Sequence, residues 1–207
     1  MSTLQEIQAV MSGFPRILAW NNFRPVQTSP SPPHLAQTSS SYSMGAWSVA
    51  LVNGEYRVRG LGITVTLNPN PTWAVSSART DAALLLHEQG HYDITGLIAR
   101  DLARKVLDLS LDATVVESLR GAGNSPIQHL RYVQQQYQTS INEFGRQATA
   151  LMNRLQTDPV TGSDGIYDVQ TNHGINKTAQ MTWNNRFQRI KGADENFELC
   201  LALEGII

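Results

Sequence analysis

The stretch LLLHEQGHYDIT, from Leu84 to Thr95, decides how this chain folds. Apolar residues recur through it and beyond it at the spacing of one helical face. Asp81, just ahead of it, is a residue type that caps helix N-termini. The pattern predicts one long helix from about residue 81 to about residue 107, with a broad face buried in the core.

The same stretch carries a candidate metal site. His87 and His91 are four residues apart, so a helix places them one turn apart on one face. Their imidazole nitrogens can then bind one zinc ion, with bonds of about 2.0–2.1 Å. Glu88 lies beside the first histidine, where it can reach water at the metal without completing the ligand set. This H-E-x-x-H arrangement predicts a zinc peptidase in which Glu88 activates a metal-bound water to hydrolyse peptide bonds.

The plain alternative is a helix whose two histidines only pack against a sheet. Three leucines precede the motif, so its first turn is expected to be anchored in the core, which would hold the ligands rigidly. Gly90 carries no side chain, which leaves room for a sheet edge or a substrate beside the metal. Both details favour the metal site.

Composition limits the other function classes. The chain has 207 residues, enough for one domain with a substantial core, and 16 basic against 17 acidic side chains. The net charge of -1 gives no basic surface for nucleic acid or for an anionic membrane. No apolar run approaches the roughly 20 residues of a membrane span. Cys200 is the only cysteine, which excludes an internal disulfide and a cysteine-based zinc cluster.

The order of predicted elements indicates a single α+β domain. Residues 1–42 are expected to be an irregular N-terminal segment, because prolines cluster between residues 24 and 41. Residues 43–157 are expected to form a small, mostly antiparallel sheet and two long helices. The sheet should contain a tight hairpin at Asn53-Gly54, and the second helix should follow Pro126. Residues 158–207 are expected to hold a ligand-bearing loop and an irregular C-terminal segment.

Several stretches together resemble the bacterial predicted secreted zinc-dependent proteases. They are ILAWNNFRP, the strand block of residues 43–67, LLLHEQGHYDITGLIARDLARK, and YDVQTNHGINKTAQMTWN. HEQGHYDI is the most specific of them, and Y-D-x-x-T-x-H-G is second. The resemblance covers about residues 17 to 183 and implies a zincin-like fold, zinc as cofactor and a protein or peptide substrate. The family is predicted to be secreted, whereas this N-terminus lacks the basic and apolar regions of a signal peptide.

The resemblance draws attention to His173, Tyr167 and Asp168 in the late stretch. His173 is the favoured third zinc ligand, because a catalytic zinc needs three protein ligands and the helix offers two. Glu143 and Glu117 are the competing third ligands. Tyr167 is a candidate oxyanion donor, with plain packing as its alternative.

Asp168 and Asp93 are candidates for orienting a ligand imidazole through its second nitrogen, with helix or turn carboxylates as the plain alternative. By analogy with zincin-like proteins, the strand ending at Leu67 is the candidate edge for pairing with an extended substrate.

Two other functions compete with peptide hydrolysis. One is a zinc-binding effector or adaptor without catalysis, which would not need Glu88. The other is a metallo-amidase that acts on a non-peptide amide, such as a cell-wall cross-link. Neither the motif nor the composition separates this second function from proteolysis.

Overall fold

The computed structural model describes residues 1–121, 123, 125–156 and 163–207, and it is a mixed α+β fold. Its helices are α1 (Leu4–Val10), α2 (Ala82–Leu107), α3 (Ala113–Arg120), α4 (Pro126–Leu155), α5 (Ile166–Thr171), α6 (Lys177–Gly192) and α7 (Phe197–Leu203). Its strands are β1 (Met11–Ser12), β2 (Arg24–Val26), β3 (Ala36–Gln37), β4 (Ser40–Met44), β5 (Ser48–Val52), β6 (Glu55–Arg59), β7 (Ile63–Leu67), β8 (Trp73–Val75) and β9 (Ser110–Asp112). In the described part of the chain, no helix has the length and apolar character needed to cross a membrane.

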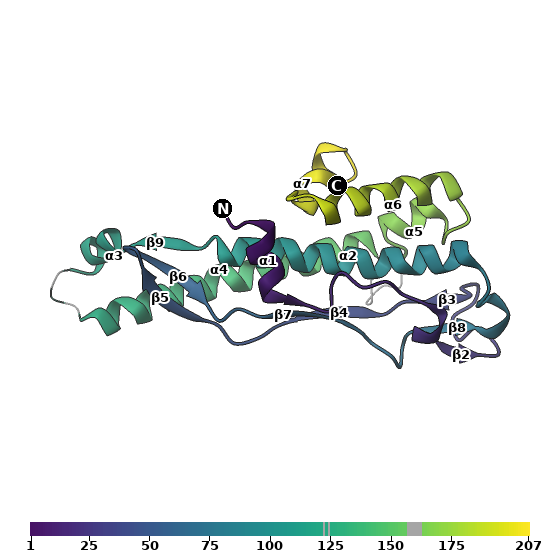
Figure 1. Ribbon diagram of the computed structural model, residues 1–207, viewed down its shortest axis with the longest axis horizontal. Helices are drawn as coiled ribbons and strands as arrows, with labels where there is room; N and C mark the ends of the chain where they lie inside the picture. Colours follow the sequence, from purple (N-terminus) through teal and green to yellow (C-terminus); the bar gives the residue numbers. More distant parts are fainter. Residues whose placement is uncertain (122, 124, 157–162) are drawn as a thin grey trace.

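Helix α2 is the central element of the molecule. It begins after Asp81, whose carboxylate accepts hydrogen bonds from the backbone N–H groups of Ala83 and Leu84. Strands β4 and β7 lie along one side of α2, and α5, α6 and α7 lie along the other (Figure 1). Almost every residue from 87 to 103 is therefore buried, the polar ones included. The predicted long helix and its cap are confirmed.

The strands form three small sheets, whereas the sequence predicted one. In the middle sheet, β7 pairs antiparallel with β4 and parallel with β1. Ile63 and Val65 of β7 are buried and its two threonines are exposed, which matches the alternation of apolar and polar residues along this strand. The strand ending at Leu67 is thus the central strand of this sheet, with β1 paired to Ile63 and Thr64, so the expectation that it forms an edge is wrong.

The other two sheets lie at opposite ends of the long axis (Figure 1). At one end, β5 and β6 form the predicted hairpin, and β9 pairs with β6. Its turn has positive φ at both Asn53 (51°) and Gly54 (81°), the conformation that a two-residue hairpin turn favours. At the other end, β8 pairs parallel with β2 and antiparallel with β3.

Helix α4 is the second long helix, and it packs along α2. Ser125 and Gln128 form a capping box at its start, and Pro126 occupies the first turn. The hydroxyl of Tyr137 donates a hydrogen bond of 2.6 Å to the carbonyl of Tyr56 in β6, which fastens α4 to the hairpin. The predicted helix is confirmed, and Ile127 in its first turn is 62% exposed.

Both segments expected to be irregular contain regular structure. Residues 1–42 include α1, which has a capping box between Thr3 and Glu6, and the short strands β1, β2 and β3, of which β2 contains Pro25. Residues 163–207 form α5, α6 and α7. Helix α6 escaped prediction because one of its four buried positions is a polar residue and its exposed face is strongly polar; these positions are Gln180, Trp183, Phe187 and Ile190. The predicted boundary near residue 157 and most of the turn-rich stretch 158–165 lie outside the described residues.

Candidate metal centre

Helix α2 presents the two predicted histidines as a pair. Nε2 of His87 and Nε2 of His91 are 3.2 Å apart, and the two rings meet edge to face with centroids 4.8 Å apart. Both histidines are buried. The i, i+4 spacing therefore brings two imidazole nitrogens to one point, as the sequence predicted.

Asp168 supplies a third atom from α5. Its Oδ1 lies 3.3 Å from Nε2 of His87 and 3.0 Å from Nε2 of His91. The Asp168 side chain is 2% exposed and the His91 side chain is 11% exposed, so the cluster is mostly buried and His91 is its more exposed member. His87, His91 and Asp168 lie close enough together to hold one metal ion.

The spacing of these three atoms fits one small divalent metal ion. Ligand atoms at about 2.0–2.1 Å from a tetrahedral ion are separated from one another by about 3.3–3.4 Å. The observed separations of 3.2, 3.3 and 3.0 Å are close to the edges of such a tetrahedron. Two imidazoles and one carboxylate are also a donor set that divalent transition metals accept.

The cluster is electrostatically coupled. Burial alone would raise the pKa of Asp168, but the adjacent His91 and His87 hold that pKa well below its usual range. Burial alone would lower the pKa of His91, but the Asp168 carboxylate outweighs it, with a smaller contribution from Glu88, and raises the pKa to about 9. A carboxylate that stays ionised is the form that a cation binds.

Glu88 is buried next to this cluster, at 2% exposure. Among the described residues, no hydrogen-bond partner reaches its buried Oε2. Buried carboxylate oxygens in folded proteins nearly always have a partner, because leaving one unsatisfied carries a desolvation penalty of about 1–3 kcal/mol or more. Glu88 follows His87 in the chain and is close enough to His91 to help raise its pKa, so its buried oxygen is an unsatisfied acceptor near the cluster.

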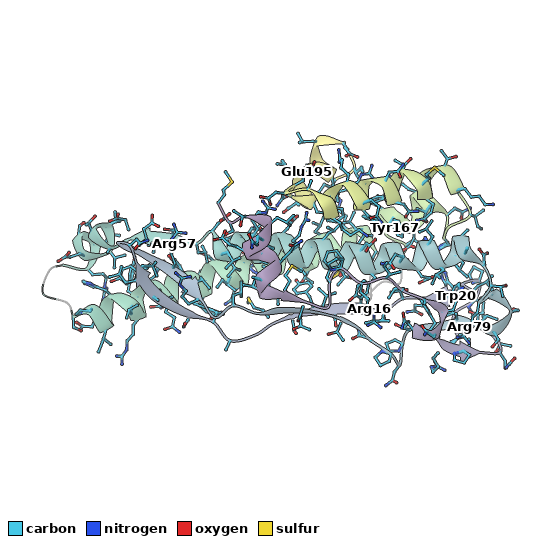
Figure 2. All side chains as sticks on the ribbon, viewed as in Figure 1. Arg16, Trp20, Arg57, Arg79, Tyr167 and Glu195 are labelled. Carbon is cyan, nitrogen blue, oxygen red and sulfur yellow. The ribbon has the colours of Figure 1, made fainter. Side chains whose placement is uncertain are left out.

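Tyr167 lies between α5 and α2 (Figure 2), and its ring contacts both histidines. Its ring stacks on His87 with centroids 4.9 Å apart, and its hydroxyl donates to the His87 backbone carbonyl at 3.0 Å. Burial raises the pKa of Tyr167 well above its usual range, so the hydroxyl keeps its proton. A Cβ at Gly90 would lie 2.0 Å from the Tyr167 hydroxyl oxygen. Gly90 therefore makes room for Tyr167, whose hydroxyl binds the backbone of α2. The oxyanion role of Tyr167 stays a prediction.

His173 lies beside the cluster, in the turn between α5 and α6. Its Nδ1 is 3.8 Å from Oδ1 of Asp168, and its Nε2 is 3.2 Å from Asp164. Its φ is 51°, an uncommon left-handed conformation for a residue other than glycine. The three converging ligand atoms do not include His173, and its role as a ligand stays a prediction.

The other candidate carboxylates do not belong to the cluster. Glu143 pairs with Arg146 on the surface of α4, and Glu117 is exposed on α3. Asp93 is buried and pairs with Lys191 at 2.9 Å. In this structure Asp168 holds the third position in place of either glutamate.

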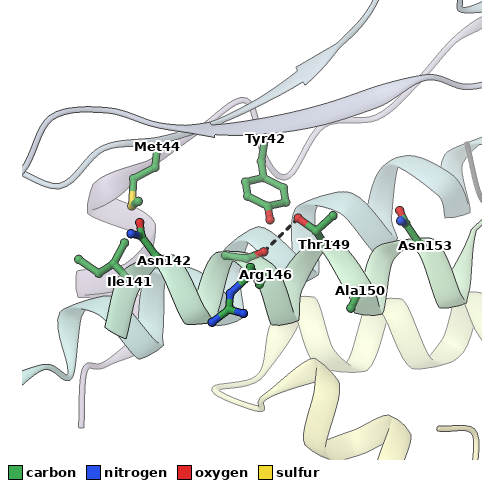
Figure 3. Close-up of a pocket in the computed structure, with 9 residues that line it drawn as sticks. Tyr42, Met44, Ile141, Asn142, Arg146, Thr149, Ala150 and Asn153 are labelled. Atoms are coloured by element: carbon green, nitrogen blue, oxygen red, sulfur yellow. Dashed lines mark hydrogen bonds between the residues drawn. The ribbon is translucent and has the colours of Figure 1, made fainter. Parts of the chain in front are cut away.

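A separate groove of about 660 Å³ runs between β4 and α4. Figure 3 shows Tyr42 and Met44 of β4 above it and the helix positions from Ile141 to Asn153 below it. No residue that lines this groove belongs to the metal cluster.

Sequence reasoning missed three features of the centre. Asp168 was considered only as an orienting residue, and Thr171 and Gln180 were not considered at all. Thr171 Oγ1 and Gln180 Oε1 lie 3.3 and 3.2 Å from Nδ1 of His87. The spacing of Asp168 and Thr171 was the available signal, because residues three apart share one face of a helix.

Comparisons with known proteins do not place the chain in a family. No protein-family model matches it, and no curated protein or solved structure matches it. The resemblance to predicted secreted zinc-dependent proteases accordingly stays a prediction.

Proposed function

We propose that this protein is a zinc-dependent hydrolase of peptide bonds. The proposal is carried by one observation, the convergence of His87 Nε2, His91 Nε2 and Asp168 Oδ1 at mutual distances of 3.0 to 3.3 Å. These three atoms would hold the ion. When bound, a zinc ion would supply a Lewis acid that polarises a carbonyl and makes water more acidic.

Glu88 is the proposed general base. Its buried Oε2, without a partner among the described residues, can accept a proton from a water that attacks the substrate carbonyl. The same carboxyl can then deliver that proton to the departing amine. A carboxylate beside the ligand atoms is what distinguishes such a site from a purely structural one.

The number of ligands supports catalysis over a structural role. Structural zinc sites are usually closed by four protein ligands, whereas catalytic sites use three and leave a position open. Within the described residues, three ligand atoms converge. The open position and the adjacent Glu88 together favour an enzyme over an effector or adaptor that only binds zinc.

The test compares the zinc-loaded parent protein with Glu88→Gln. We expect the parent to cleave an unfolded protein substrate, and Glu88→Gln to keep its zinc while losing at least about 100-fold in rate. Glu143→Gln is the matched control, because it changes a glutamate that pairs with Arg146 on the surface of α4. It should behave like the parent.

Peptidoglycan fragments form the second arm of the same experiment. Cleavage of these fragments with no cleavage of unfolded proteins would replace peptide hydrolysis by the amidase alternative. Full activity in Glu88→Gln would refute the proposed mechanism for either substrate.

A further inference from the structure

Two side chains contact Nδ1 of the His87 imidazole. Its Nδ1 lies 3.2 Å from Oε1 of Gln180 and 3.3 Å from Oγ1 of Thr171. Gln180 is 3% exposed, and Thr171 is fully buried. These contacts are on the side of the ring opposite Nε2, the atom that faces His91 and Asp168.

The surrounding hydrogen bonds make both contacts acceptors. Thr171 donates its hydroxyl proton to the carbonyl of Tyr167 at 2.7 Å, which leaves its oxygen lone pairs for Nδ1. Tyr167 donates its own proton to the carbonyl of His87, so its oxygen must accept from Gln180. The amide nitrogen of Gln180 makes that bond at 2.7 Å and a second one to Asn184 at 3.0 Å. The amide is thereby fixed with Oε1 toward His87.

We infer that Gln180 is a positioning residue that sets the tautomer and orientation of His87. With two acceptors facing it, Nδ1 must carry the proton, and the lone pair of the neutral ring is then on Nε2. This is the nitrogen that points at Asp168 and His91. The tautomer of His87 follows from these contacts alone. Only its functional consequence rests on the proposed zinc site: Nε2 keeps a lone pair that can bind the metal ion.

The fold explains how a residue 93 positions away reaches His87. The turn between α5 and α6 passes through Asn172, His173 and Gly174, which all have positive φ. A Cβ on Gly174 would lie 3.0 Å from Cβ of His87, so the turn packs directly against the Cβ that carries the imidazole ring. One helical hairpin therefore delivers both Asp168, as a ligand, and Gln180, as the partner behind the ring.

Two substitutions of Gln180 distinguish the loss of its hydrogen-bond acceptor from a change in packing. Gln180→Met keeps the volume and removes the acceptor, and we expect zinc affinity to fall about 10- to 100-fold. Gln180→Glu keeps an acceptor toward Nδ1 while losing the donor to Tyr167, and we expect zinc affinity within about 3-fold of the parent. Gln170→Met is the matched control, because Gln170 accepts a hydrogen bond from Trp183 in the same helical hairpin without touching His87. It should bind zinc like the parent.

Nitrogen-15 NMR of the imidazoles gives a readout that needs no enzyme activity. In metal-free parent protein, we expect the Nδ1 proton of His87 to be observed in slow exchange with water. In Gln180→Met this proton should exchange faster or the ring should populate both tautomers, whereas Gln170→Met should keep the parent signal.

The outcomes separate this inference from the proposed function. If the parent protein does not bind zinc ions, the proposed function fails, and the metal-free NMR comparison still decides the role of Gln180. An Nδ1 proton unchanged in Gln180→Met, together with parent-like zinc affinity, would overturn the inference alone. Equal loss of zinc in Gln180→Met and Gln180→Glu would also overturn it, because the contact to Tyr167 would then be the one that matters.

Discussion

Gly90→Ala is a one-carbon change that reaches the metal centre through packing. The added Cβ would lie 2.0 Å from the Tyr167 hydroxyl oxygen and 2.4 Å from its Cζ. Ordinary van der Waals contact begins near 3.4 Å, whereas the new Cβ would lie 2.0 Å from the hydroxyl oxygen. The Tyr167 ring must therefore move away by about 1.4 Å, the difference between the two distances. Tyr167 is fully buried, and its ring contacts Trp183 and Phe187 from the side of α6. The retreat therefore has to push α5 and α6 away from α2.

The magnitude follows from three contributions. Overpacking costs about 1–3 kcal/mol. Losing the hydrogen bonds of Tyr167 to the His87 carbonyl and from Gln180 costs about 1 kcal/mol each. Alanine is favoured over glycine in a helix by about 1 kcal/mol, which offsets part of the loss. We expect the free energy of unfolding to fall by about 2–4 kcal/mol. Because Asp168 follows Tyr167 in the chain, zinc affinity should fall as well.

Urea denaturation and zinc titration of Gly90→Ala measure the two effects. Gly145→Ala is the matched control, since no atom lies within 4 Å of a Cβ at that helical position. This control should be unchanged or up to about 1 kcal/mol more stable. A Gly90→Ala protein with parent stability and parent zinc affinity would refute the close packing of Tyr167 against α2.

Two further predictions concern buried charges on α2. Burial raises the pKa of Asp101 to about 6, although backbone N–H groups of α7 and nearby arginines oppose the shift. The folded state therefore holds more protons than the unfolded state between about pH 4 and 6, so this group's stabilisation is complete below pH 3.8 and is lost as pH rises through 6. Parent stability minus Asp101→Asn stability should fall by up to about 3 kcal/mol between pH 4 and 7, and a difference that does not vary with pH would contradict the shift. Lys191→Met should cost about 3 kcal/mol by leaving buried Asp93 without its cation, and adding Asp93→Leu should recover most of that loss; a double variant no more stable than the single one would contradict the pairing.

The sequence predicted the elements that depend on local signals. The α2 helix has an apolar period and a cap at Asp81, and the β5–β6 hairpin has Asn53-Gly54 at its turn. Helix α4 has Pro126 in its first turn and a regular apolar stripe. Each of these signals lies within one segment, so no long-range contact is needed to interpret it.

Features that depend on contacts between distant segments were not predicted. The number of sheets depends on which strands pair, and β7 pairs with β1 and β4, which both precede it in the chain without being adjacent to it in sequence. Helix α6 presents Gln180 to the core because His87 and Tyr167 satisfy its amide there. Asp168 becomes a candidate ligand because the packing of Tyr167 over Gly90 brings α5 against α2. Neither the amide partners nor the glycine contact is visible in the local sequence.

The most direct test of the central claim is the zinc content and the zinc dissociation constant of Asp168→Ala, measured beside His173→Ala. The account predicts one zinc ion per chain in the parent protein, retained in His173→Ala. In Asp168→Ala the affinity should fall by at least about 100-fold, since one of three ligands is removed. Parent-like zinc binding in Asp168→Ala, with loss of zinc in His173→Ala, would contradict the account and would make His173 the third ligand.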